Sequence, residues 1–224
     1  MCEHRAAVGS AAAASAAAAL VLHGLFLRPR MLTWGATREE AARSYPGDEL
    51  VPGARSSSTM ATTLPAPPAE VWRWLAQMGC DRGGWYSWDL LDNGGRPSAD
   101  RIVPQWQGLE QGQRLASVPS DRAWFTVAAL APERTLVLRA DMRLPSGRPF
   151  DPFRGPAPLA FVSSVWGFHL GPVGPDTRLV VRTHGRSRPR VFTKPMDLVF
   201  WEPAHFIMQT RQFHNLRARL TPAA

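Results

Sequence analysis

The sequence predicts an α+β domain in which one curved antiparallel sheet is covered by a long C-terminal helix. Two observations indicate this fold class. Five segments with the composition of strands follow one another in the second half of the chain, and the short turns between them favour antiparallel neighbours. Residues 202–220 then have the apolar spacing of an amphipathic helix, which can cover the apolar face of such a sheet.

Residues 1–30 form an N-terminal hydrophobic segment. Residues 6–27 contain no Asp, Glu, Lys or Arg, and a helix of that length would span about 33 Å, enough for the core of a bilayer. Because the segment is mostly alanine, three interpretations stay open: a membrane anchor, an export signal, or an alanine-rich helix that is disordered or lies on a surface. We expect the anchor. The arginines that follow it place the domain on the cytoplasmic side, and the alternative is a soluble cytoplasmic protein.

Residues 31–56 are expected to form a linker with one short helix. Thr37 and Glu40 have the spacing of a capping box, in which each side chain bonds the backbone N–H of the other residue. Prolines and glycines then end this helix. Residues 57–224 are expected to form the main domain. The domain begins with a strand at 57–64, where alternation and β-branched threonines indicate extended structure.

A helix and a long irregular loop come next. Residues 68–78 carry apolar side chains at helical spacing, with Pro68 in the first turn and Gly79 at the stop. Residues 90–112 are rich in Gly, Pro, Asn and Asp, a composition typical of loops that cover a binding site. The remaining strands are predicted at 113–118, 123–130, 135–144, 159–170 and 177–186.

Residues 82–89, RGGWYSWD, place three aromatic residues with polar groups directly after two glycines. In an extended chain alternate side chains point to opposite faces, so Trp85 would face one way and the pair Tyr86 and Trp88 the other. These rings are either structural packing or the wall of a pocket, where their N–H and O–H groups would orient a ligand. Both interpretations stay open.

Residues 202–220 are predicted to pack on the sheet through one face. The residues of that face are Phe206, Thr210, Phe213, Leu216 and Leu220. Glu202 and His205 lie three residues apart on the same helix, a spacing that binds metals when it is present twice, with further carboxylates on other helices. The sequence contains one copy and no matching glutamate helix, so no metal site is predicted.

Composition argues against several other classes of function. The formal net charge is +8, but the basic residues are scattered and no nucleic-acid motif accompanies them. We therefore expect no nucleic-acid partner. The two cysteines, Cys2 and Cys80, exclude a disulfide framework. Neither double glycine has the context of a phosphate-binding loop, and no cofactor is predicted.

Several stretches together resemble a known family. They are LTWGATREEA, YPGDELVPGA, APPAEVWRWLAQMG, RGGWYSWDLLDN, ADRIVPQWQGLEQGQRL and EPAHFIMQTRQF. Over roughly residues 31–220 the chain is similar to bacterial members of the SRPBCC superfamily, the START-like helix-grip proteins often labelled polyketide cyclase/dehydrase or lipid-transport-like. The resemblance implies a sheet that grips the C-terminal helix around an apolar cavity, and often an N-terminal hydrophobic segment. It supplies no catalytic residues, because the superfamily hosts many activities and the function of this subgroup is mostly unassigned.

We therefore expect the main domain to bind a lipid-like or polyketide-like molecule between the sheet and the C-terminal helix. The residues predicted to line this cavity are Trp85, Tyr86, Trp88, Trp106, Trp166, Phe206 and Phe213. One alternative is an enzyme of the cyclase or aromatase kind, which would use one general acid or base in the cavity. The candidates for that role are Tyr86, Asp89, His169 and His184. The other alternative is a non-catalytic scaffold whose cavity is filled by its own side chains. The sequence leaves the oligomeric state open.

Overall fold

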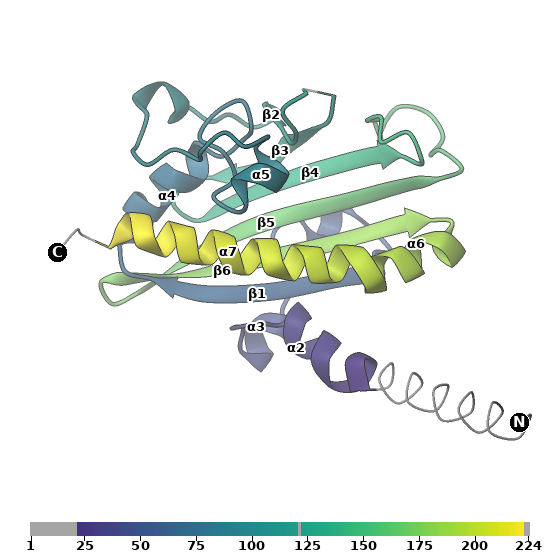
Figure 1. The fold of residues 1–224 in the computed structure, drawn as a ribbon, viewed down its shortest axis with the longest axis horizontal. Coiled ribbons are helices and arrows are strands. Elements are labelled where there is room, and N and C mark those ends of the chain that lie inside the picture. The colour runs from purple at the N-terminus through teal and green to yellow at the C-terminus, as the bar shows by residue number, and fades with distance from the viewer. Residues whose placement is uncertain (1–21, 121, 222–224) are drawn as a thin grey trace, which may run out of the picture.

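The computed structural model describes residues 22–120 and 122–221 and has an α+β fold (Figure 1). One six-stranded antiparallel sheet has the strand order β1-β6-β5-β4-β3-β2. The strands are β1 (Ser56–Leu64), β2 (Arg114–Ala116), β3 (Trp124–Ala131), β4 (Thr135–Arg143), β5 (Phe161–Val173) and β6 (Asp176–Arg188). Each of them lies where the sequence predicted a strand, so the prediction of one antiparallel sheet is confirmed.

The long helix α7 (Glu202–Leu220) crosses one face of the sheet (Figure 1), with the bounds that the apolar periodicity predicted. Two elements that were not predicted, α6 (Arg190–Met196) and η4 (Asp197–Trp201), lead directly into it. Pro195 lies inside α6, and an internal proline normally argues against a helix. The other helices are η1 (His23–Leu27), α2 (Arg28–Leu32), α3 (Arg38–Ala42), η2 (Asp48–Leu50), α4 (Pro68–Ala76), α5 (Asp89–Asp92) and η3 (Pro104–Trp106).

The main core lies between α7 and the face of the sheet that this helix covers. Leu138 and Phe168 of the sheet are fully buried there, in one cluster with Phe213 and Leu216 of α7. Full burial of such a side chain stabilises the fold by about 1.5–3 kcal/mol. Phe206 is only partly buried against this cluster. The face of α7 that was predicted to be buried is therefore less completely covered at its N-terminal end.

Residues 45–54, which were expected to belong to a linker, lie against the opposite face of the sheet. Val51 packs there with Val137 and Val165, and all three side chains are buried. Consecutive strand residues point to opposite faces, so Val137 is buried on one face while its neighbour Leu138 is buried on the other. The sheet therefore has apolar cover on both sides.

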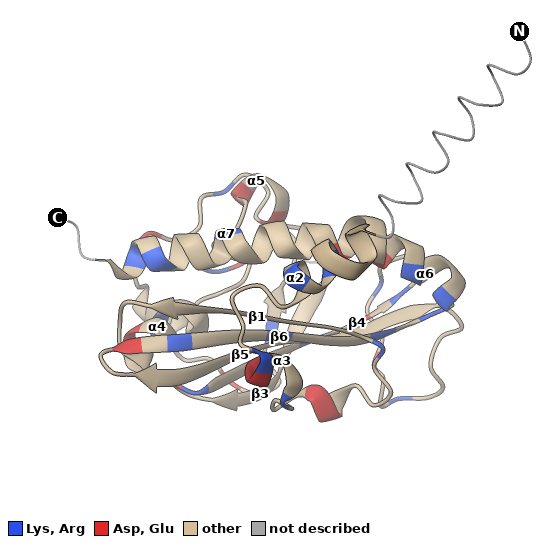
Figure 2. Ribbon diagram, turned by 90° about the horizontal axis from the view of Figure 1, so that it is seen from below, with Lys and Arg blue, Asp and Glu red and all other residues tan. Residues whose placement is uncertain are grey.

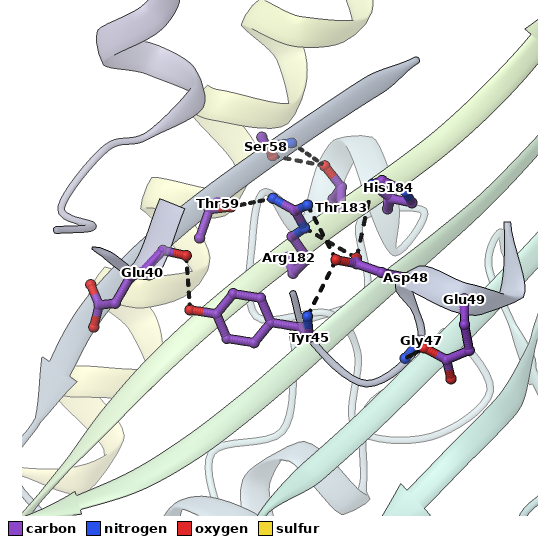
Figure 3. A network of polar contacts seen from close by, with 10 residues as sticks. All are labelled: Glu40, Tyr45, Gly47, Asp48, Glu49, Ser58, Thr59, Arg182, Thr183 and His184. Carbon is purple, nitrogen blue, oxygen red and sulfur yellow. Dashed lines mark hydrogen bonds and ion pairs between the residues drawn. The ribbon is translucent and has the colours of Figure 1, made fainter. Parts of the chain in front are cut away.

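Polar contacts hold residues 37–50 to β6. The predicted capping box is present, with Thr37 and Glu40 bonding each other's backbone at the start of α3. Glu40 also pairs with Arg178 at 2.8 Å, and Asp48 pairs with Arg182 at 3.1 Å. Figure 3 shows that the Asp48 and Arg182 side chains meet above the strands, close to the start of η2. These pairs attach residues 37–50 to the domain.

The chain passes around the edge strand β1 at Gly35. The Trp34 carbonyl accepts a hydrogen bond from the Ala61 N–H of this strand at 2.9 Å. Gly35 has φ +70°, and a Cβ atom there would lie 2.1 Å from the Ala61 oxygen, so only glycine fits the crossing. On the α7 side, the Trp34 ring stacks on Phe213 with 6.0 Å between ring centroids.

The membrane prediction falls mostly on residues that the structure does not describe. Of the expected anchor at 6–27, residues 6–21 lie outside the described residues, and 22–27 begin the described chain. Within 22–120 and 122–221, no helix has both the length and the apolar character that a membrane crossing requires.

Candidate functional site

The stretch RGGWYSWD is not an extended segment with alternating side chains. Tyr86 has φ +57°, a left-handed conformation that is uncommon for residues other than glycine. This turn places both Trp85 and Tyr86 in the interior, at 3% and 0% exposure, and leaves Trp88 at the surface with 44% exposure. The predicted alternation is therefore wrong, because the backbone conformation at one residue redirects the side chains that follow.

The backbone of this stretch is bonded to α7. Gln212 Nε2 donates to the Trp85 carbonyl at 2.8 Å. Asn215 Nδ2 donates to the carbonyls of Tyr86 and Ser87 at 3.0 and 3.1 Å. Side-chain amides one turn apart on α7 thus satisfy three successive carbonyl groups that burial removes from water. The contacts fix the glycine-rich turn against the helix.

Four rings from the turn and the sheet form an aromatic cluster, consisting of Trp85, Phe125, Trp166 and Phe168. The ring centroids of Trp85 lie 5.4 Å from Phe125 and 5.5 Å from Trp166. Trp166 lies 4.7 Å from Phe168. Trp85 and Phe168 are buried, whereas Phe125 and Trp166 are partly buried at the border of the core. The cluster therefore has a closed base and a partly accessible side.

Polar side chains of α7 continue from this cluster along the helix. Trp166 Nε1 donates to Gln209 Oε1 at 3.2 Å, and Gln209 Nε2 donates to Gln212 Oε1 at 2.8 Å. One turn earlier, the Nε2 atom of His205 is enclosed without a hydrogen-bond partner among the described residues. Burial lowers the pKa of His205 to about 4, so its imidazole is neutral at physiological pH.

The remaining predicted ligand-binding residues lie in different places. Phe206 is partly buried and packs against the core. Phe213 is buried further along α7, under Trp34. Trp88 is exposed, with the Arg211 guanidinium 4.8 Å from its ring centroid. Trp106 lies in η3 within the irregular loop. The predicted set therefore divides into three groups. Trp85, Tyr86 and Phe213 are buried in the core, Trp166 and Phe206 lie at its border, and Trp88 and Trp106 lie outside it.

The four predicted acid/base candidates are not brought together. The Tyr86 hydroxyl is buried and accepts a hydrogen bond from Gln77 Nε2 at 2.9 Å, and burial raises its pKa to about 12. Asp89, at the start of α5, accepts a hydrogen bond from the Ser98 hydroxyl. His169 and His184 point to the face of the sheet away from α7. His184 Nδ1 lies there 3.8 Å from Asp48 (Figure 3).

Asp92 is a buried carboxyl group outside the predicted set of acid/base candidates. It ends α5 and is 8% exposed, and its carbonyl accepts a hydrogen bond from the Cys80 thiol at 2.8 Å. Burial, with a smaller contribution from the charge of Asp89, raises the pKa of Asp92 to about 6.

The aromatic cluster lines neither of two hollows found on the described residues. One, of about 260 Å³, lies at the C-terminal end of α7 beside Trp74 and Arg219. The other, of about 700 Å³, lies between η1 and α6. No group of three or more His, Cys, Asp and Glu side chains in the described ranges could hold a metal ion. Glu202 instead pairs with Arg28, with Nε and Oε2 2.6 Å apart.

Comparisons with known proteins give structural similarity at low sequence identity. No protein-family model matches the chain, and no curated protein matches it. Protein MLL2253 from Mesorhizobium loti aligns with a TM-score of 0.45 and 17% identity, over 74% of this chain and 96% of that chain. A protein from Nitrosospira multiformis aligns with a TM-score of 0.44 and 14% identity, over 74% and 97%. Ms6760 from Mycobacterium smegmatis aligns with a TM-score of 0.43 and 12% identity, over 75% and 92%. At these TM-scores the similarities carry no argument about family or activity.

Proposed function

We propose that the domain binds an apolar small molecule against the partly accessible side of the aromatic cluster. The observation that carries this proposal is the incomplete burial of Phe125, Trp166 and Phe206, which pack on the core but keep part of their surface open. Apolar rings at the border of a core favour a ligand that can cover them. The Trp166 N–H already donates to Gln209 Oε1, so such a molecule would contact the rings through their apolar surface.

The contacts support binding more than catalysis. A general acid or base must exchange a proton near the operating pH. The Tyr86 hydroxyl is buried with its pKa raised to about 12, and His169 faces away from α7. The enzyme alternative is left with no group from the predicted set beside Phe125 and Trp166. The filled scaffold stays a serious alternative, because Trp85 and Phe168 already occupy the base of the cluster.

A titration with a fluorescent fatty acid tests this proposal. Trp166→Phe removes the indole N–H and part of the contact surface, and should weaken binding by about 0.5–1.5 kcal/mol, up to about tenfold. Trp88→Phe is the matched control, because Trp88 is exposed and lies outside the cluster. Thermal melting of each variant verifies folding. A wild-type chain that binds no apolar probe would instead support the filled scaffold, and weakened binding in Trp88→Phe alone would move the site to the loop.

We also infer that the domain is a START-like helix-grip protein of the SRPBCC superfamily. Support comes from the motifs shared over roughly residues 31–220 and from the order of elements. A strand and a short helix are followed by a loop, five antiparallel strands and a long C-terminal helix. A crystal structure with a ligand held between α7 and the sheet would test the inference together with the binding proposal.

We further propose that residues 6–27 attach the domain to a membrane, with the domain on the cytoplasmic side. The absence of charged residues in this range and the arginines after it support the proposal. Cell fractionation tests it: the full-length chain should pellet with membranes and be released by detergent. Recovery in the supernatant after high-speed centrifugation would favour the unanchored alternative.

A further inference from the structure

Large apolar side chains are exposed on two segments at the N-terminal end of α7. We call these side chains the apolar patch. The patch consists of Leu22, Leu25, Phe26 and Leu27 before and within η1, and Val191, Phe192, Met196, Val199, Phe200 and Trp201 on α6 and η4. Their exposed fractions range from 53% to 80%. Monomeric soluble proteins rarely leave apolar side chains gathered in this way without a partner.

The two segments of the patch lie side by side. They face each other across the hollow of about 700 Å³, which His23 and Gly24 line from one side and Val191 and Val199 from the other. The ion pair between Arg28 and Glu202 joins the same two segments at 2.6 Å. Residues more than 160 positions apart in the sequence therefore form one continuous surface.

Basic residues accompany the patch. Residues 22–30 and 188–202 contain five Lys and Arg side chains but two Asp and Glu side chains. The five are Arg28, Arg30, Arg188, Arg190 and Lys194. Figure 2 shows the basic positions of α6 beside the end of α7. One of the two acids, Glu202, is already paired with Arg28, so the surface offers a net positive charge around its apolar side chains.

The described chain begins inside this patch. Leu22 is its first residue, and 21 residues precede it. Of those, residues 6–21 contain no Asp, Glu, Lys or Arg. The sequence that leads into the patch therefore carries no charged side chain from residue 6 to residue 21.

We propose that the apolar patch docks on the surface of an anionic lipid bilayer. Trp201, Phe200 and Phe192 would enter the region between headgroups and acyl chains, which aromatic and large aliphatic side chains favour. Arg188, Lys194 and their basic neighbours would lie against anionic headgroups. The inference requires neither a ligand at the aromatic cluster nor a transmembrane segment, because α6 and η4 supply the contact from the folded domain.

A label on η4 tests the docking in the full-length chain. Val199 is 80% exposed within the patch, and Val173 is 53% exposed at the opposite end of the β5–β6 hairpin. Val199→Cys and Val173→Cys would each carry an environment-sensitive nitrobenzoxadiazole group, with Cys2 replaced by serine and the buried Cys80 retained. Phosphatidylglycerol vesicles with doxyl-labelled acyl chains should shift the emission of the Val199 label to the blue and quench it. The Val173 label should keep its emission.

Charge reversal provides the second part of the test. Lys194→Glu reverses one charge beside the patch, and should raise roughly tenfold the lipid concentration that half-quenches the Val199 label. Arg134→Glu makes the same change in charge in the β3–β4 turn, at the far end of the sheet, and should alter that concentration less than about twofold.

Three results would overturn the docking proposal. A chain that does not sediment with the vesicles has no membrane-binding surface. A chain that sediments while the Val199 label stays unquenched is held by residues 6–21 alone. A blue shift without vesicles that grows with protein concentration shows that a second copy of the chain covers the patch. None of these results bears on fatty-acid binding at the aromatic cluster.

Discussion

Replacing His169 with glutamine should remove part of the protein's sensitivity to acid. His169 lies on β5 and is 8% exposed, with its ring centroid 4.8 Å from that of Tyr45. Neither ring nitrogen has a hydrogen-bond partner among the described residues. Burial lowers the pKa of His169 to about 4; Asp48 opposes this shift, and the charges of Arg43 and Arg182 reinforce it. The folded protein therefore holds His169 in its neutral form.

The sign of the effect follows from the two pKa values. In the unfolded chain the histidine pKa is about 6.5, so the unfolded state binds a proton before the folded state does. Protonation of His169 therefore has no effect on the free energy of unfolding well above pH 6.5. It lowers this free energy as the pH falls from 6.5 towards 4. The difference of about 2.5 pKa units corresponds to about 3 kcal/mol at full protonation of the unfolded state.

Urea unfolding at a series of pH values between 4 and 7 measures this cost. His169→Gln should lose about 3 kcal/mol less than wild type over that range, whatever its own stability at pH 7. The curves of wild type and His169→Gln must be compared, because Asp92 also contributes to the pH dependence of both. Its pKa is raised to about 6, so its protonation stabilises the folded state as the pH falls through that value. His214→Gln, at an exposed histidine, is the control. Parallel curves for wild type and His169→Gln would refute the assignment of a buried neutral imidazole.

Two further substitutions test the packing. Phe213→Ala should destabilise the domain by about 3–5 kcal/mol, because the ring is 2% exposed and stacks on Trp34. Thermal melting should show a large decrease in Tm, with His214→Ala as the exposed neighbour, and equal melting of the two would mean that α7 does not cover the sheet. Gly83→Ala should cost about 1–3 kcal/mol in urea unfolding, since a Cβ atom there would lie 2.7 Å from a backbone oxygen. Gly108→Ala has open space around its Cβ and should stay within about 0.5 kcal/mol of wild type; a Gly83→Ala variant as stable as Gly108→Ala would contradict the tight packing of the turn.

Local patterns in the sequence were enough to locate most elements. The six strands, the capping box at Thr37 and the bounds of α7 were all predicted, because alternation, capping and helical periodicity act between residues close in sequence. Helices α6 and η4 were not predicted, because their residues show no such local pattern. Pro195 and an uninterrupted run of apolar residues give no amphipathic period there.

The composition of the candidate site depended on contacts between distant residues. Periodicity assigns His169 to one of two faces of β5, but only the packing of residues 45–54 shows that this face lies away from α7. Gln209 and Gln212 lie outside the predicted apolar face of α7, yet both side chains are buried, and Trp166 and the Trp85 carbonyl supply hydrogen-bond partners for them. A buried amide is stable when its partners are present, and those partners come from β5 and from the turn after α4, which no pattern within residues 202–220 can reveal.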